Sequence, residues 1–153
     1  THLAFGALLG MVFLGFNSIN PMVYFLLVLF GSLMPDIDEP RSKISNSVPF
    51  VPNILAVFTD HRGIFHSVFM AVLLPGLLWL SFGYGYALAL FIGYASHLLI
   101  DAMTVQGINF LHPVSRLRLS GFIETGSFLE ILLFLVIIGC DVFILTTGHL
   151  IFL

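Results

Sequence analysis

The chain has 153 residues, of which 59% are hydrophobic and only 8% are charged, and its net charge is -3. A soluble domain carries about 25% charged residues, so this composition excludes an ordinary soluble domain, and it is too apolar for intrinsic disorder. The length fits a single domain, residues 1–153. One cysteine, Cys140, excludes a cysteine-rich zinc site and an internal disulfide framework. No basic run indicates a nucleic acid as a partner.

Long stretches without charge predict helices that cross a membrane. Residues 1–35 and 67–100 contain no Asp, Glu, Lys or Arg, and residues 128–153 contain only Glu130 and Asp141. About 20 apolar residues are enough for one crossing, and ~34 residues of helix would extend roughly 50 Å. The first two stretches are therefore too long for one crossing each. Turn-forming residues at 17–21 and 82–85 divide them into helical hairpins.

The predicted fold class is all-α, a polytopic membrane bundle of about five transmembrane helices. In chain order these helices cover residues 3–16, 22–34, 67–82, 86–104 and 128–152. With five crossings, the two polar segments at 35–66 and 105–127 lie on the same side of the membrane. All five basic residues fall in these segments: Arg41, Lys43, Arg62, Arg116 and Arg118. The positive-inside rule then places both segments in the cytoplasm and the C-terminus outside an inner membrane.

Candidate metal ligands gather at one end of the predicted bundle. Ionisable residues in or beside spanning helices are costly and usually functional. Eight of them lie at the predicted cytoplasmic helix ends: His2, Asp36, Asp38, His61, His66, His97, Asp101 and Glu130. Imidazoles and carboxylates from separate segments suit zinc, manganese or iron. The four carboxylates carry four negative charges, which two divalent ions would neutralise.

Simpler interpretations stay open for several of these residues. His97 and Asp101 are four residues apart, so they share a helix face and could form a buried ion pair without metal. Asp36 and Asp38 repel each other unless a cation or a donor lies between them, but they could also cap a turn.

Two positions on the last predicted helix also have structural interpretations. Ser127 and Glu130 fit a capping box, with Ser at the helix start and Glu three residues later. Asp141 lies eleven residues after Glu130 and on nearly the same helix face, so we expect it to face the bundle interior.

Four ordered motifs resemble the YdjM-like family. They are Thr1–Leu3, Leu33–Ser42, His61–Ser67 and Gly93–Thr104, followed by Gly107–Pro113, Arg116 with Arg118, and Gly126–Ser127 with Glu130. The family comprises small bacterial and archaeal membrane proteins described as LexA-binding, inner-membrane-associated metal-dependent hydrolases. It is grouped with zinc-dependent phospholipase C and related zinc nucleases, which hydrolyse phosphate esters.

The resemblance implies metal-ligating roles for the same eight residues. The soluble enzymes have further histidines after their His-x-x-x-Asp, and this chain has Ser127 where one would be expected. The resemblance therefore implies one or two ions, most simply zinc with manganese as the alternative, instead of three.

Two classes of function follow as hypotheses. The first is a membrane-bound metal-dependent hydrolase that acts on a phosphate ester, a phospholipid or a polyprenyl phosphate, through metal-activated water. One of Asp36 and Asp38 would bind metal while the other acts as general base, and Arg62 would neutralise the phosphate. The candidate substrate-binding residues are Arg41, Lys43, Arg62 and Thr104.

The second class is a non-catalytic, metal-stabilised membrane scaffold or a small transporter. Transport needs polar residues deep along a path, whereas here nearly all of them lie at one end. In both classes the bilayer is a partner, and the oligomeric state is left open.

Overall fold

The computed structural model describes residues 1–38, 64–115 and 117–148. Several predicted site residues lie outside these ranges: Arg41, Lys43, His61 and Arg62. Arg116 lies outside them as well, and the side chain of Asp38 is not described. The predicted roles of these residues stay predictions.

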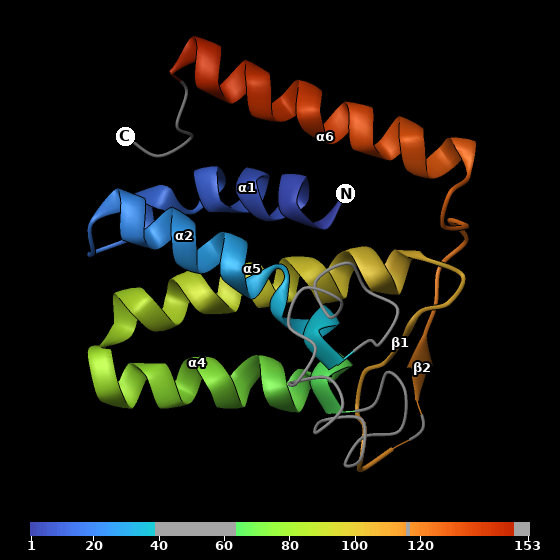
Figure 1. Ribbon diagram of the computed structural model, residues 1–153, viewed down its shortest axis with the longest axis horizontal. Coiled ribbons are helices and arrows are strands. Elements are labelled where there is room, and N and C mark those ends of the chain that lie inside the picture. Colours follow the sequence, from blue (N-terminus) through green and yellow to red (C-terminus); the bar gives the residue numbers. More distant parts are fainter. Residues whose placement is uncertain (39–63, 116, 149–153) are drawn as a thin grey trace.

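The described residues form a mainly helical bundle, as predicted (Figure 1). Its α-helices are α1 (His2–Val12), α2 (Pro21–Gly31), α4 (Val68–Phe82), α5 (Tyr84–Met103) and α6 (Phe128–Thr147). Short 3₁₀ helices are η1 (Leu14–Phe16), η2 (Met34–Asp38) and η4 (Ile64–His66). These bounds agree with the predicted ranges to within a few residues wherever the structure describes both ends.

Helix lengths do not support the prediction of five crossings. In the described part of the chain, α5 and α6 have 20 residues each and are long and apolar enough to cross a membrane. The helices α1, α2 and α4 have 11, 11 and 15 residues, which is short of the ~20 that a crossing needs. The charge-free stretches led to an overestimate of the lengths of these three helices, because 3₁₀ helices and turns take up part of each stretch.

The two predicted hairpin turns are confirmed. Asn20 caps α2, because its Oδ1 accepts from the backbone N–H of Met22 at 2.9 Å, and Pro21 begins the helix. Gly83 separates α4 from α5 with a φ of 97°, a conformation that favours glycine.

We expect Asn20→Ala to lower the free energy of unfolding by about 1 kcal/mol, the usual effect of losing a helix cap. Thermal unfolding in detergent micelles, followed by circular dichroism, measures this loss. Ser18→Ala is the control, since Ser18 is exposed in the same turn. Equal unfolding temperatures for the two variants would contradict the prediction.

Helix α5 is the centre of the bundle. The helices α1, α2 and α4 pack on it, and α6 packs on α1 at the outside (Figure 1). The backbones of α2 and α5 touch at two glycines. A Cβ atom added to Gly93 would lie 2.0 Å from the carbonyl oxygen of Val28, and one added to Gly31 would lie 2.6 Å from that of Leu90. Close helix contact at small residues is a main source of stability within a membrane.

The segment between α5 and α6 contains a small sheet. Strand β1 (Ile108–Asn109) pairs antiparallel with β2 (Arg118–Leu119), and Ile108 lies opposite Leu119. The all-α prediction is therefore wrong for this segment. Strands of two residues are too short to show an alternating pattern, so only their pairing reveals them.

Candidate metal centre

Imidazoles and carboxylates come together at one end of the bundle, where α1 begins and α5 ends (Figure 1). His2 begins α1, Asp36 lies in η2 after α2, and His66 ends η4 before α4. His97 and Asp101 occupy the last two turns of α5. The structure thus brings together five of the eight predicted ligands, from four separate segments of the chain.

Short distances connect these five side chains. Asp101 Oδ1 lies 3.1 Å from His2 Nε2, and Asp101 Oδ2 lies 3.5 Å from both His66 Nε2 and His97 Nε2. Asp36 Oδ1 lies 3.6 Å from His97 Nε2 and 3.9 Å from His66 Nε2. Two overlapping groups of three, His2/His97/Asp101 and Asp36/His66/His97, each have ligand atoms within 4.8 Å of one another.

His97 is the residue that both groups share. Its side chain is 0% exposed, and its Nδ1 lies 2.8 Å from the carbonyl oxygen of Ser32. Because a carbonyl only accepts, Nδ1 carries the proton, and the lone pair of the neutral ring is on Nε2. A histidine held through one nitrogen by a carbonyl while the other faces carboxylates is the usual arrangement of a metal ligand.

The Nε2 atom of His97 has no hydrogen-bond partner among the described residues. The nearest carboxylate oxygens, at 3.5 and 3.6 Å, lie beyond the ~2.7–2.9 Å of a charge-assisted hydrogen bond. A buried polar atom without a partner is costly. A cation between His97, Asp36 and Asp101 would satisfy it, so the donor set fits a divalent ion.

The contact between the glycines positions His97. Gly31 directly precedes Ser32 at the end of α2, and Gly93 is one turn before His97 on α5. Backbone contact at these glycines lets the Ser32 carbonyl reach His97 Nδ1. On α1, Gly6 leaves room for Ser32, since a Cβ atom on Gly6 would lie 2.8 Å from the Ser32 Cβ.

The ring packing and a tyrosine hold the other histidines. The ring of His2 stacks on that of His97 with centroids 4.2 Å apart, and the ring of His66 meets His97 edge-on at 5.4 Å. The hydroxyl of Tyr94, one turn before His97, donates to the carbonyl of Phe65 at 2.5 Å. This bond connects α5 to η4 beside His66.

Glu130 lies outside both three-residue groups. Its Oε1 accepts from the Thr1 hydroxyl at 3.0 Å, and its Oε2 accepts from the N–H of Gly126 at 2.7 Å. Ser127 Oγ accepts from the Glu130 N–H at 3.4 Å. The capping interpretation is therefore confirmed for Ser127, whose side chain accepts from the Glu130 N–H. The Glu130 carboxylate accepts from the N–H of Gly126 instead of that of Ser127. These contacts assign Glu130 a structural role at the start of α6.

Thr104 has a local role at the end of α5. Its hydroxyl donates to the Asp101 carbonyl at 2.8 Å and accepts from the Gly107 N–H at 3.1 Å. Both contacts are with backbone at the end of the helix. Neither contact tests the predicted role of Thr104 in binding substrate, which stays a prediction. Thr104 also lines the cavity described next.

A cavity of about 140 Å³ adjoins the cluster. His2, Asp36 and Asp101 line it together with Thr104 and Glu130. The side chain of Asp36 is 30% exposed, against 11% for Asp101. Asp36 is thus the more accessible of the two carboxylates.

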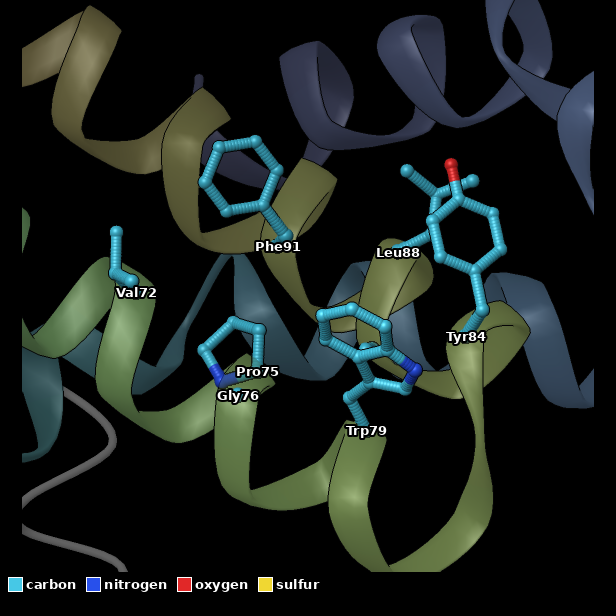
Figure 2. A pocket seen from close by; sticks show the side chains of 8 residues that line it. Val72, Pro75, Gly76, Trp79, Tyr84, Leu88 and Phe91 are labelled. Atoms are coloured by element: carbon cyan, nitrogen blue, oxygen red, sulfur yellow. The ribbon is translucent and has the colours of Figure 1, made fainter.

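Two further features lie outside the cluster. Asp141 is buried, as expected from its helix face, and its Oδ1 has no hydrogen-bond partner among the described residues. Figure 2 shows a second hollow, of about 270 Å³, between α4 and α5. Its lining is almost wholly apolar and includes Pro75, Trp79, Leu88 and Phe91.

A helical bundle with two helices of spanning length and a largely buried His/Asp cluster at one end defines an apolar helical protein with a candidate metal centre. The chain belongs to the YdjM inner membrane protein family, whose model matches residues 1–152. This membership supports a location in the inner membrane.

The chain is similar to bacterial proteins that have been named. The chain is 35% identical over 105 residues to the uncharacterized protein YvsG of Bacillus subtilis, covering 65% of this chain and 64% of YvsG. It is 30% identical over 87 residues to the inner membrane protein YdjM of Escherichia coli, covering 53% of this chain and 44% of YdjM. The matches thus span less than two thirds of both relatives. Neither name states an activity, and no solved structure is significantly similar to the chain.

Proposed function

We propose that this protein is a membrane-bound metal-dependent hydrolase that acts on a phosphate ester at the membrane interface. The observation that carries the proposal is His97, whose Nδ1 is held by Ser32 while its buried Nε2 faces two carboxylates without a hydrogen bond among the described residues. Zinc fits a set of imidazoles and carboxylates best, and manganese is the alternative.

The residues that would hold the ion are His2, Asp36, His66, His97 and Asp101. A bound divalent ion acts as a Lewis acid and activates water at neutral pH. The Ser32 carbonyl keeps His97 in the tautomer that presents Nε2. Asp101 orients His2 from 3.1 Å. Asp36, the more exposed carboxylate, would bind the ion at the open side of the cluster, which leaves the role of general base to Asp38.

The position of the cluster supports a substrate in the headgroup layer. It lies where α5 ends and close to the start of α6, the two helices of spanning length. A phospholipid or a polyprenyl phosphate presents its phosphate at this depth. The grouping of the YdjM-like family with zinc-dependent phospholipase C, which the sequence motifs imply, would also favour a phosphate ester. Arg62, with Arg41 or Lys43, would neutralise the phosphate.

The proposed topology is multi-pass, with the cluster on the cytoplasmic side. All basic residues of the chain fall in the sequence segments 35–66 and 105–127, which five crossings would put on one side of the membrane. Helix α6 starts at the end of the bundle that carries the cluster, so its C-terminus would lie on the outer side.

We expect Asp101→Asn to lower phosphate-ester hydrolysis by about 100-fold or more, because it removes a ligand and releases His2. The assay uses zinc-loaded protein in detergent, a panel of phospholipids and polyprenyl phosphates, and detection of the released phosphorylated product. Glu124→Gln is the matched control, since Glu124 is an exposed carboxylate of the 105–127 segment. The variant and the control are also compared for metal content.

A metal-stabilised scaffold predicts a different result. The cluster joins four segments of the chain, so an ion would stabilise the fold even without catalysis. Bound metal that raises the unfolding temperature, with no turnover on the whole panel, would favour the scaffold over the hydrolase.

A further inference from the structure

The segment between α5 and α6 exposes large apolar side chains on a short hairpin. Val114 is 78% exposed and Phe122 is 75% exposed, and Leu117 between them is half exposed. Large apolar side chains left in water are unfavourable, so their exposure along one segment beside helices of spanning length favours contact with a partner or a membrane.

The hairpin lies where a membrane surface would be. Strand β1 begins shortly after α5 ends, and β2 leads toward the start of α6, so spanning-length helices tether both ends of the hairpin. In Figure 1 the strands run across the direction of the helices, at the end of the bundle where α1 begins and α5 ends. The loop between the strands reaches sideways past α4. If α5 and α6 cross a bilayer, a hairpin in this position would extend over the bilayer beside the bundle.

Hydrogen bonds hold the base of the hairpin against α5. The N–H of Val105 donates to the carbonyl of Ile123 at 3.0 Å, and the N–H of Ile123 donates to the carbonyl of Met103 at 3.1 Å. Gly121 packs against α5, where an added Cβ would lie 2.2 Å from the Met103 carbonyl oxygen. The direction in which the hairpin projects is therefore set by α5.

The charge of the hairpin fits a lipid surface. Arg118 is exposed on β2, and its Nε–H donates to the carbonyl of Gln106 at 2.9 Å. This bond keeps a cation beside the apolar side chains. A cation at the level of lipid phosphates with apolar side chains just below it is the usual pattern of a segment at the membrane interface.

We propose that the hairpin of β1 and β2, described for residues 108–115 and 117–119, forms an interfacial anchor together with Phe122. It inserts Val114, Leu117 and Phe122 at the boundary of headgroups and acyl chains, and it places Arg118 among the anionic phosphates. Because the hairpin is fixed to the end of α5 that carries His97 and Asp101, it sets the depth of the cluster relative to the headgroups. The anchor does not depend on the hydrolase proposal.

The test is a single-cysteine labelling experiment in vesicles. Cys140, which is exposed on α6, is first replaced by alanine. Val114→Cys, Phe122→Cys and the control Glu124→Cys are then labelled with a nitrobenzoxadiazole dye and reconstituted in phosphatidylcholine with or without phosphatidylglycerol. Nitroxide attached to lipid and aqueous iodide serve as quenchers, and circular dichroism checks that each labelled protein is folded.

We expect blue-shifted emission at positions 114 and 122, several-fold stronger quenching by the lipid nitroxide than at position 124, and weak quenching by iodide. When Arg118→Gln is added to the labelled variants, phosphatidylglycerol should increase quenching by the lipid nitroxide less than it does with Arg118 present. Iodide quenching at 114 and 122 equal to that at 124 would refute the anchor. Protection from both quenchers would also refute it, because it would indicate a protein surface against the hairpin.

Discussion

His97→Ala is expected to reduce bound metal to less than a tenth of the wild-type content. His97 is the one residue shared by both three-residue groups, so its loss breaks both of them. The expected loss of metal affinity exceeds the 10–100-fold loss that is typical when a residue supporting a ligand is removed, because His97 would itself be a ligand.

The measurement is the metal content per chain of detergent-purified protein after refilling with zinc or manganese. His112→Ala is the matched control, since His112 belongs to the hairpin segment and to neither group. His97 is fully buried, so circular dichroism must show that the variant is folded. His2→Ala, at the partly exposed edge of the cluster, should keep the fold and bind metal more weakly. A folded His97→Ala protein that retains its metal would falsify the candidate centre.

Gly93→Ala is expected to destabilise the bundle by about 3 kcal/mol or more and to lower metal content with it. The new Cβ would lie 2.0 Å from the Val28 carbonyl oxygen and 2.9 Å from the Ser32 nitrogen, both backbone atoms of the α2 region. Backbone cannot move aside as a flexible side chain can, so α2 must shift away from α5. The Ser32 carbonyl then withdraws from His97 Nδ1.

Thermal unfolding in detergent and metal content, measured on the same samples, check this expectation. Gly139→Ala is the matched control, because Gly139 is also within a spanning-length helix and an added Cβ there meets nothing within 4 Å. That control should unfold at or slightly above the wild-type temperature, since alanine favours helix more than glycine. If Gly93→Ala unfolds at the same temperature as Gly139→Ala, the helices do not touch at Gly31 and Gly93.

Several features of the fold could be predicted because their signals are local. Asn20 and Pro21 are residue types that start a helix, and Gly83 accepts a φ of 97° without strain because glycine has no Cβ atom. The capping interaction of Ser127 could also be predicted from residues three positions apart in the sequence. These signals depend on backbone geometry within a few residues, so no partner segment is needed to read them.

The candidate site could be predicted only in part. Residue types and helix ends indicated His2, Asp36, His66, His97 and Asp101, and the structure brings these side chains together. Glu130 had the same signal but is held by Thr1 and Gly126. The sequence pattern did not indicate Ser32, because this residue contacts His97 through its backbone carbonyl, which every residue type has. A motif of side chains therefore could not have identified Ser32.

Composition and spacing thus place apolar helices, their turns and the end of the bundle at which polar side chains gather, because each of these follows from solvation and from neighbouring residues. The choice of partners required the tertiary structure. Ser32 and His97 meet across 65 positions of the chain, and they meet only because two glycines let α2 and α5 touch. The pairing of β1 with β2 and the shortness of α1 and α2 likewise depend on how the segments pack, which local propensity does not encode.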